Sequence, residues 1–355
     1  MSKDPNDLLV SQFDYALPER LIAQSPLDRR SDSRLMIIDR KKGHLDDTYF
    51  FRLADWLQSG DVLVINDTKV IPARLLGHKP SGGHVECLLL ERLDDCRWKT
   101  LVKPGQRLQP GAVMIFGDGI LTGVIEERGE LGERIVRFSW PEKRPFEEVL
   151  DQLGEMPLPP YIHLALKEKQ RYQTVYAKAS GSAAAPTAGL HFTPELMQQL
   201  QQQGIEFVSL TLHVGIGTFR PVKVNQISEH KMHSEYYQLT EAEAERINRA
   251  KANGHRIISV GTTSCRVLET LADASGRLQA ASGWTDIFIY PGYHFKLIDG
   301  LITNFHLPKS TLLMLVSAFS SWEIVKKSYQ EAIQQEYRFF SFGDVTFFAN
   351  HAERS

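Results

Sequence analysis

Five short segments combine Gly, Thr and His where strand-like runs end, and they are the part of the chain best suited to chemistry. They cover residues 185–192, 212–219, 260–264, 289–292 and 303–308. Ligands of α/β sheets bind at the carboxyl ends of the strands, so the five segments predict one shared site. His191, His213 and His306 lie within them and could move protons near neutral pH, although each could also be a hydrogen-bonded core histidine.

Two of these segments offer places for an anionic group. Thr262 and Thr263 stand where a strand passes into a helix, so their hydroxyls and the free backbone N–H groups could hold a carboxylate or phosphate, or could simply cap the helix. Gly215 and Gly217 form a G-x-G after a strand. Arg220 stands where a third glycine is needed and no helix signal follows, so this is not a dinucleotide loop.

One further group has the spacing of metal ligands. His230 and His233 are three residues apart, and Glu235 follows closely. Zinc binds such side chains, and a metal-dependent hydrolase is the alternative enzyme that this group suggests. Because neither a third ligand nor an open coordination position can be identified, a hydrogen-bonded loop is the favoured interpretation.

The charge balance limits how nucleic acid could be bound. The 355 residues contain 41 Lys and Arg against 43 Asp and Glu, so no strong overall field draws the chain to RNA or to a membrane. The clearest local basic excess comprises Lys167, Lys169, Arg171 and Lys178 against the single acid Glu168. This cluster predicts either a phosphate-backbone contact or an ordinary solvated face.

The elements that must position these residues fall into two classes. Short β-rich runs with Gly-containing turns occupy residues 85–140, which is typical of a small barrel or sandwich. In the C-terminal half, strands alternate with helices. One helix is predicted from Thr193 to Gly204, another from Thr240 to Gly254 and a long one over 311–337, with a strand over 286–290.

We therefore expect an α/β fold with a mixed sheet, built from both ends of the chain (1–70 and 153–355), and a small β-barrel domain inserted at 71–152. Three cysteines without a C-x-x-C pair indicate a reducing, cytoplasmic compartment. No apolar stretch approaches the roughly 20 residues of a membrane span. No coiled-coil heptad or long apolar helix stripe is apparent, so a monomer is expected.

Several long motifs, in order, resemble one known family. The resemblance runs from about residue 13 to 348 and includes 21–24 (LIAQ), 66–68 (NDT), 70–74 (VIPAR), 156–162 (MPLPPYI), 171–176 (RYQTVY), the five segments above and 337–341 (YRFFS). The chain resembles the S-adenosylmethionine:tRNA ribosyltransferase-isomerases of bacterial queuosine biosynthesis. That family implies an α/β domain with an inserted β-barrel and a cleft between them.

The resemblance also implies an activity. The family transfers and isomerises the ribosyl part of S-adenosylmethionine onto the 7-aminomethyl-7-deazaguanine at the wobble position of tRNA with a GUN-type anticodon. The product is epoxyqueuosine-tRNA, and adenine and methionine are released. S-adenosylmethionine is consumed as a substrate, so no cofactor is expected. The non-enzymatic alternative is an RNA-binding module in which the Gly-rich loops are only structural.

Roles for individual residues follow from this chemistry. A base must remove a proton from the ribose carbon beside the sulfonium, and histidine suits that role. His191 or His213 is the expected base, with His306 or His233 as acid or orienting group. Arg266 could neutralise a tRNA phosphate or the carboxylate of the donor.

The substrates should contact three further sets of residues. A sulfonium prefers aromatic faces and carboxylates, which makes Tyr290, Phe305 and Asp344 candidates. The amino-acid tail of the donor is expected near Thr187, Gly189, Gly215, Gly217, Thr218, Thr262 and Thr263. Arg74 and Arg171 are expected to contact the tRNA.

Overall fold

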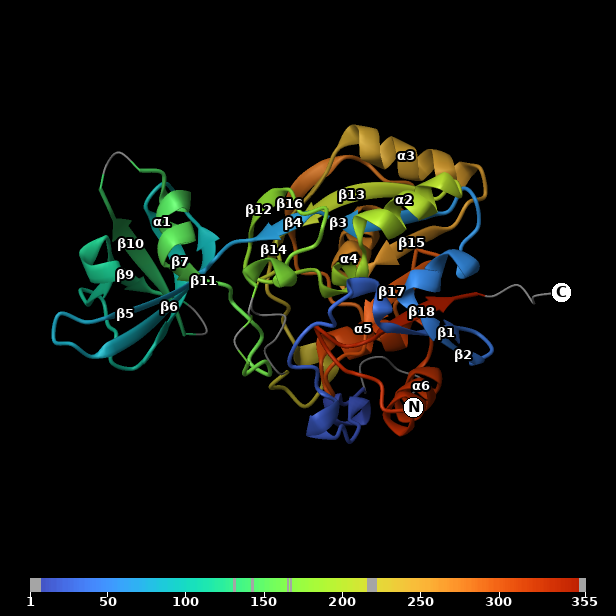
Figure 1. Ribbon diagram of the computed structural model, residues 1–355, viewed down its shortest axis with the longest axis horizontal. Helices are drawn as coiled ribbons and strands as arrows, with labels where there is room; N and C mark the ends of the chain where they lie inside the picture. Colours follow the sequence, from blue (N-terminus) through green and yellow to red (C-terminus); the bar gives the residue numbers. More distant parts are fainter. Residues whose placement is uncertain are drawn as a thin grey trace. The chain divides into compact units, whose positions relative to one another are not determined.

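The computed structural model describes residues 8–129, 132–141, 144–164, 166, 168–215 and 222–350. The chain divides into two compact units (Figure 1). Unit 1 comprises Met1–Thr68, Pro159–Ala179 and Ala185–Ser355, and unit 2 comprises Lys69–Leu158 and Ser180–Ala184. Unit 2 thus takes in the expected insertion 71–152 together with a few flanking residues and one short segment from further along the chain.

Unit 1 is built on a nine-stranded sheet. Its strands, in spatial order, are β16 (Ala281–Thr285), β14 (Glu235–Leu239), β13 (Glu206–Leu212), β3 (Val62–Asn66), β15 (Ile257–Val260), β17 (Gly300–Asn304), β18 (Val345–Ala349), β1 (Arg34–Asp39) and β2 (Leu45–Tyr49). Pairing is parallel from β13 through β3 and β15 to β17 and again between β18 and β1, and antiparallel elsewhere. The predicted mixed-sheet α/β class is confirmed.

The described helices of unit 1 are α2 (Pro194–Gln202), α3 (Glu241–Ala252), α4 (Gly261–Leu271), α5 (Thr311–Phe319) and α6 (Trp322–Gln334). Four of the five begin at a capping hydroxyl, and α4, which follows Val260, has none. Thr193 Oγ1 accepts the N–H of Leu196, and Thr240 caps α3 in the same way. The region 311–337, expected to be mostly helix, contains two helices, because Ser320 leaves helical geometry and Ser321 caps a new start.

The strand expected at 286–290 was placed wrongly. The strand of this region, β16, covers Ala281–Thr285 and pairs antiparallel with β14 at the edge of the sheet. Its sequence ASGWT mixes Trp and Thr, which favour strands, with Gly and Ala, which are depleted in them. Pairing with β14 decides its conformation, and that information is absent from the local pattern.

Unit 1 also contains short elements, and its core lies against the sheet. The 3₁₀ helices of this unit are η2 (Val10–Phe13), η3 (Glu19–Leu21), η4 (Arg30–Asp32), η5 (Phe50–Trp56), η8 (Lys169–Tyr172), η9 (Thr187–His191) and η11 (Ile227–Glu229). The parallel strands β3, β15 and β17 are buried on both faces, as expected of parallel sheets. Leu63, Ile258 and Ile302 from these strands pack with Phe192 and Leu200 in one apolar cluster.

Unit 2 contains a closed six-stranded antiparallel barrel. Its strands are β5 (Arg74–His78), β6 (His84–Arg92), β7 (Arg97–Lys103), β8 (Val113–Phe116), β9 (Leu121–Arg128) and β10 (Glu133–Ser139), and β5 pairs with both β6 and β8. Unit 2 also contains helix α1 (Phe146–Leu153), the turn η6 (Gly117–Gly119) and the short strand β11 (Gly154–Glu155), which pairs with β5. A separate small sheet is formed by β4 (Thr68–Val70) and β12 (Ala179–Ser182). Closure leaves the barrel without open edges.

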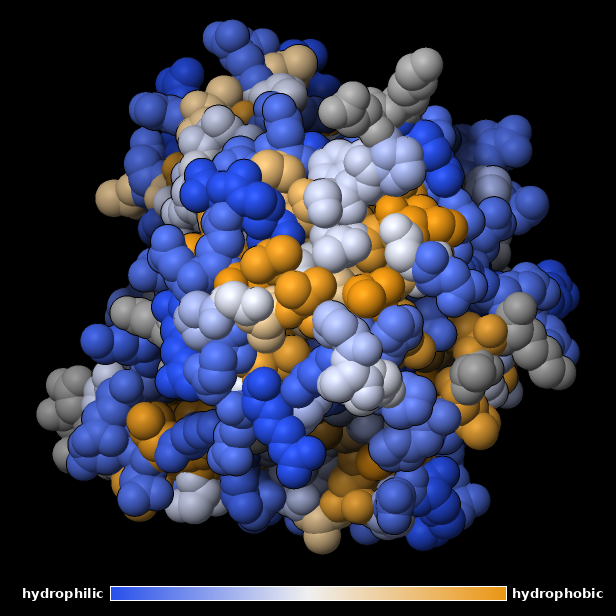
Figure 2. Space-filling model, turned by 90° about the vertical axis from the view of Figure 1, so that its left-hand side faces the viewer, coloured by the Kyte–Doolittle hydropathy of each residue, from blue (hydrophilic) through white to orange (hydrophobic). Residues whose placement is uncertain are grey.

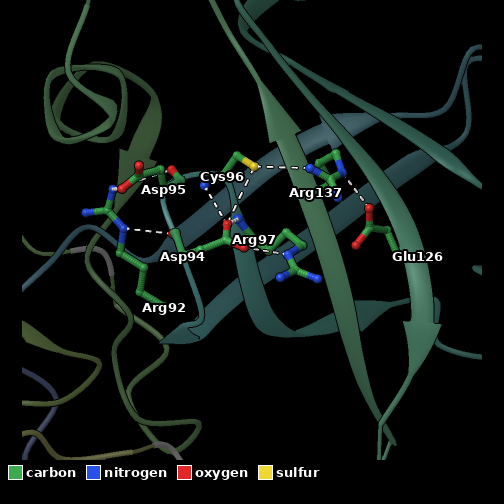
Figure 3. A network of polar contacts seen from close by, with 7 residues as sticks. All are labelled: Arg92, Asp94, Asp95, Cys96, Arg97, Glu126 and Arg137. Atoms are coloured by element: carbon green, nitrogen blue, oxygen red, sulfur yellow. Dashed lines mark hydrogen bonds and ion pairs between the residues drawn. The ribbon is translucent and has the colours of Figure 1, made fainter.

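The surface of unit 2 is partly apolar, and its turns are held by charged side chains. Figure 2, which looks onto the side of Figure 1 that carries unit 2, shows apolar side chains gathered between polar ones. In this unit Leu76 is 46% exposed. Figure 3 shows the turn between β6 and β7, where Asp94 accepts the backbone N–H groups of Cys96 and Arg97 and pairs with the Arg97 side chain. Arg137 reaches Cys96 Sγ at 3.4 Å.

Candidate active site

The strand register brings most of the predicted segments to one edge of the unit 1 sheet. The parallel strands β13, β3, β15 and β17 end there, and the antiparallel neighbours β14 and β18 begin there. His213, Glu235, Gly261, Asn304 and Asp344 therefore all stand at this edge. Segments separated by more than 100 residues in sequence are neighbours because the carboxyl ends of parallel strands share one side of a sheet.

A pocket opens at this edge, entirely within unit 1. Five of the predicted site residues line it: Thr187, Thr262, Thr263, Phe305 and His306. The other lining residues are Tyr161, Ala185, Pro186, Ala188, Val214, Gly261, Thr303, Asn304, Leu307, Ser310, Leu312, Phe340 and Ser341. The lining combines hydroxyls, an amide and an imidazole with aromatic and aliphatic walls, as ligand sites commonly do.

The N-terminus of α4 forms one wall of the pocket. Gly261 turns the chain from β15 into the helix with φ of +88°, a conformation that glycine adopts without strain. No acidic residue occupies the first turn. The hydroxyls of Thr263 and Ser264 are buried and have no hydrogen-bond partner within the described part of the chain. Free N–H groups and unsatisfied hydroxyls at a helix start suit an anionic group.

His191 lies behind the pocket wall and not in its lining. Its Nδ1 is 2.7 Å from Ser33 Oγ, which itself donates to the carbonyl of Arg30, so Nδ1 carries the proton. Its Nε2 accepts a hydrogen bond from Asn304 Nδ2 at 3.1 Å. Burial lowers the pKa of His191 to about 3. Both ring nitrogens are occupied and the ring is neutral, so His191 is built to orient Asn304.

Asn304, which His191 orients, also binds a second residue of the pocket lining. Its Oδ1 accepts a hydrogen bond from Thr187 Oγ1 at 2.9 Å, and both residues line the cavity. Sequence reasoning singled out the segment 303–308 but missed Asn304 itself. The available signal was a polar amide directly after an apolar strand, a place where a buried side chain needs partners.

His306 lines the pocket and is also uncharged. Its Nε2 is 2.8 Å from Thr303 Oγ1, and its backbone N–H donates to the hydroxyl of Tyr329. Burial lowers the pKa of His306 to about 3. A neutral imidazole fixed in this way can form a hydrogen bond to a bound ligand, but it cannot deliver a proton at neutral pH as an imidazolium.

His213 differs from the two buried histidines because it is only half-buried. Thr68 Oγ1 donates to the carbonyl of Ala179 and lies 2.8 Å from His213 Nδ1, so it accepts the Nδ1 proton. Nε2 then carries the free lone pair, and it has no hydrogen bond within the described residues. Burial lowers the pKa of His213, so the ring is unprotonated at neutral pH.

Glu235, His233 and Arg266 form a charged group at the same edge of the sheet as His213, with Glu235 and Arg266 buried. Glu235 binds Arg266 Nη1 directly, lies 3.2 Å from His233 Nε2 and accepts the backbone N–H of Gly215 at 2.9 Å. The side chains of Glu235 and Arg266 are 1% and 4% exposed. Burial alone would raise the pKa of Glu235, but the Arg266 charge and the hydrogen bonds of His233 and Gly215 outweigh it and hold the pKa at about 2.

Three predicted substrate residues have other roles in the structure. Asp344 accepts the backbone N–H groups of Arg34 and Arg338, which fixes the entry into β18, and it does not line the pocket. Gly189 is buried in η9, where a Cβ atom would lie 2.0 Å from Tyr176 Oη. Tyr290 is half-buried and packs on Phe288, outside the pocket lining. Gly217 and Thr218 lie outside the described residues.

The two predicted tRNA contacts already have partners inside the protein. Arg74 belongs to unit 2 and pairs with Glu86 at 3.2 Å and Glu155 at 3.4 Å. Arg171 belongs to unit 1 and donates to the backbone carbonyls of Leu27 and Asp28. Both guanidinium groups therefore have a structural role.

The metal-dependent hydrolase finds no support in the described residues. No group of three or more His, Cys, Asp or Glu side chains is arranged there to hold a metal ion. His233 and Glu235 are instead tied to Arg266. Within the same ranges, no helix combines the length and apolar character needed to cross a membrane.

Comparison with known proteins identifies the family. A family model described as queuosine biosynthesis protein matches residues 10–348. The S-adenosylmethionine:tRNA ribosyltransferase-isomerase of Desulfitobacterium hafniense is 58% identical over 337 residues, which cover 95% of this chain and 98% of that protein. The crystal structure of S-adenosylmethionine tRNA ribosyltransferase from Thermotoga maritima matches 95% of this chain and 100% of its own, at 38% identity and a TM-score of 0.55. The chain therefore belongs to the queuosine biosynthesis protein family.

Proposed function

We propose that this protein is an S-adenosylmethionine:tRNA ribosyltransferase-isomerase of queuosine biosynthesis. It transfers and isomerises the ribosyl part of S-adenosylmethionine onto the 7-aminomethyl-7-deazaguanine at the wobble position of tRNA with a GUN-type anticodon, releasing adenine and methionine. The observation that carries the proposal is the 58% identity to an enzyme of that name, across nearly the full length of both chains. S-adenosylmethionine is a substrate here, and the proposed reaction uses no further cofactor.

The pocket in unit 1 is suited to the S-adenosylmethionine molecule. Its carboxylate is a small anion, and the start of α4 with Thr262 and Thr263 offers N–H groups and hydroxyls for it. Phe305 belongs to the same lining, but it is fully buried against Tyr329 and Phe339, so it would support the wall beside the sulfonium and not offer it an open ring face. No Lys or Arg lines this pocket among the described residues, so no fixed positive charge opposes the sulfonium there.

We assign His213, which stands at the same sheet edge as the pocket but is not one of its lining residues, as the proton-removing base. Among the described residues its Nε2 lone pair has no partner, since Thr68 accepts a hydrogen bond from Nδ1–H, and burial lowers the pKa of the ring and keeps it in the basic form at neutral pH. The step removes a proton from the ribose carbon next to the sulfonium, which the positive sulfur makes acidic, and adenine then leaves. His191 is a positioning residue that acts through Asn304, and His306 is a neutral hydrogen-bonding group in the pocket.

His233 is assigned to orientation as part of the charged group with Glu235 and Arg266. Because Glu235 stays ionised, its carboxylate accepts hydrogen bonds from Nε2–H of His233 and from the backbone N–H of Gly215 and holds both in place. Arg74 and Arg171 stay proposed contacts to the tRNA. The side chain of Arg74 is 40% exposed and can offer a surface cation in addition to its internal ion pairs.

The decisive experiment is an adenine-release assay. The purified protein is incubated with S-adenosylmethionine and tRNA that carries 7-aminomethyl-7-deazaguanine at the wobble position, or with the same tRNA carrying guanine there. We expect adenine release only with the modified tRNA. A pure RNA-binding protein would bind both and release adenine from neither, and this outcome would refute the proposal.

Replacing His213 tests the assignment of the base. His213→Ala should lower kcat/KM by more than about tenfold, which corresponds to roughly 1.4 kcal/mol of barrier. The matched control is His44→Ala, since His44 has a largely exposed side chain at the far edge of the sheet and should leave the rate unchanged. The acidic limb of the wild-type pH profile should lie below 6.5, because burial lowers the pKa of His213. An unchanged rate in His213→Ala would show that another group is the base.

A further inference from the structure

Three aromatic rings form a row across one end of the unit 1 sheet. The backbone N–H of His213 donates to the carbonyl of Tyr236 in β14, and Tyr236 is directly opposite Trp284 in β16. Side chains that are directly opposite on neighbouring strands project from the same face of a sheet. His213, Tyr236 and Trp284 therefore lie side by side on that face.

The ring geometry confirms this row. His213 and Tyr236 are nearly parallel, with centroids 5.7 Å apart and an angle of 22°. Tyr236 and Trp284 meet edge to face at 5.8 Å and 73°. The alternate residues of β14, Glu235 and Tyr237, are buried on the other face.

The outer end of the row is open. Trp284 is 53% exposed, whereas Trp56, Trp98, Trp140 and Trp322 are all buried or half-buried. An edge-to-face contact with Tyr236 covers only part of the indole and leaves a ring face accessible. The exposed indole at the outer end of this row of rings offers a large aromatic surface next to a polar site. An unstacked nucleobase can stack on such a surface.

We propose that Trp284 and Tyr236 form a stacking platform for an unpaired tRNA base next to the nucleotide that reacts. This proposal rests on the proposed function, which makes tRNA the occupant and places the reacting base near His213. Neighbouring strands are 4.7–4.9 Å apart, so Trp284 lies roughly 10 Å from His213. At that distance the platform cannot bind the reacting base itself. It would bind a neighbouring base of the anticodon loop. Stacking depends on an aromatic surface and tolerates different bases, so the platform binds without reading sequence.

The test uses the full-length protein and an anticodon stem-loop RNA with 7-aminomethyl-7-deazaguanine at the wobble position. Trp284→Leu removes the aromatic ring and keeps an apolar side chain, whereas Trp284→Phe keeps a ring. We expect Trp284→Leu to raise KM for the RNA about tenfold with kcat changed less than twofold, and Trp284→Phe to remain near wild type. The matched control is Phe51→Leu, because Phe51 is 45% exposed in the unit that also carries Trp284, on the segment that follows the opposite edge strand β2.

A second measurement detects stacking directly. Binding of the stem-loop should quench tryptophan fluorescence in the wild-type protein and in Phe51→Leu, and this quenching should be absent in Trp284→Leu. The exposure of Trp284 predicts unchanged thermal unfolding in both Trp284 variants, which checks that they are folded. Equal KM values and equal quenching in wild type and Trp284→Leu would overturn the platform while leaving adenine release, and so the proposed function, intact. If wild type releases no adenine, the proposed function fails, and the quenching still decides whether RNA stacks on Trp284.

A result in which Trp284→Leu changes the oligomeric state and leaves RNA binding unaltered would also overturn the proposal. In that case the exposed ring would be an interface between two copies of the chain. Sedimentation of wild type and Trp284→Leu at the concentrations of the binding assay distinguishes these outcomes.

Discussion

The buried pair of Glu235 and Arg266 allows a quantitative prediction. Replacing Glu235 by Gln keeps the shape of the side chain but leaves the Arg266 guanidinium buried without its counter-charge. Removing one partner of a buried ion pair costs about 3–5 kcal/mol. The pKa of Glu235 gives an independent figure: a fall from its usual 4.5 to about 2 corresponds to roughly 3 kcal/mol of stability at pH 7. The two figures agree, so Glu235→Gln should destabilise unit 1 by about 3 kcal/mol.

The sign of the pH dependence follows from the lowered pKa. A carboxylate with a depressed folded-state pKa stabilises the protein above its unfolded pKa, and that stability is lost as the pH falls through the folded pKa. The difference in the free energy of unfolding between wild type and Glu235→Gln should therefore disappear as the pH falls from about 4.5 to 2. Calorimetric unfolding of both proteins at several pH values measures this difference.

A double variant separates the loss of attraction from the cost of the unpaired charge. Glu235→Gln combined with Arg266→Met removes both charges, and it should recover much of the stability that Glu235→Gln loses, because no buried charge is left uncompensated. If the double variant is no more stable than Glu235→Gln alone, the reasoning from the unpaired guanidinium is wrong. A pH-independent difference between wild type and Glu235→Gln would equally contradict it.

Three further predictions concern the surroundings of the pocket. Gly189→Ala should destabilise the protein by about 1–3 kcal/mol, because its Cβ would lie 2.0 Å from Tyr176 Oη; a thermal unfolding temperature equal to wild type would contradict this. Thr193→Ala removes the cap that accepts the N–H of Leu196 and should cost about 1 kcal/mol, or about 2–4 °C in Tm, by calorimetry. Asn304→Ala should raise KM for S-adenosylmethionine about tenfold in the adenine-release assay, since it removes an amide from the pocket lining; an unchanged KM would show that the amide does not contact this substrate.

Local patterns were sufficient for much of the fold. The hydroxyls of Thr193 and Thr240 predicted two helix starts, because a capping side chain satisfies backbone N–H groups within its own turn. Short β-rich runs separated by Gly-containing turns predicted the barrel region, and β6 and β7 show the alternating burial of its strands. The resemblance of the motifs predicted the family, and the comparisons confirm it.

Patterns failed where distant segments decide the outcome. The residues of β16 have mixed strand propensities, and pairing with β14 places the strand at Ala281–Thr285 and not at 286–290. Asp344 was a candidate contact to the sulfonium because a positively charged sulfur prefers carboxylates. In the structure its two oxygens accept the N–H groups of Arg34 and Arg338, contacts that join the two ends of the chain.

The sequence by itself determined which residue types are available, which short segments carry them and to which family the chain belongs. The tertiary structure alone decided how the histidines differ. His191 and His306 are neutral because they are buried, and within the described residues His213 has a ring nitrogen without a partner because Thr68, 145 residues away, accepts a hydrogen bond from the other one. Burial and hydrogen-bond partners set the pKa and tautomer of an imidazole, and both come from segments that meet only when the sheet has formed.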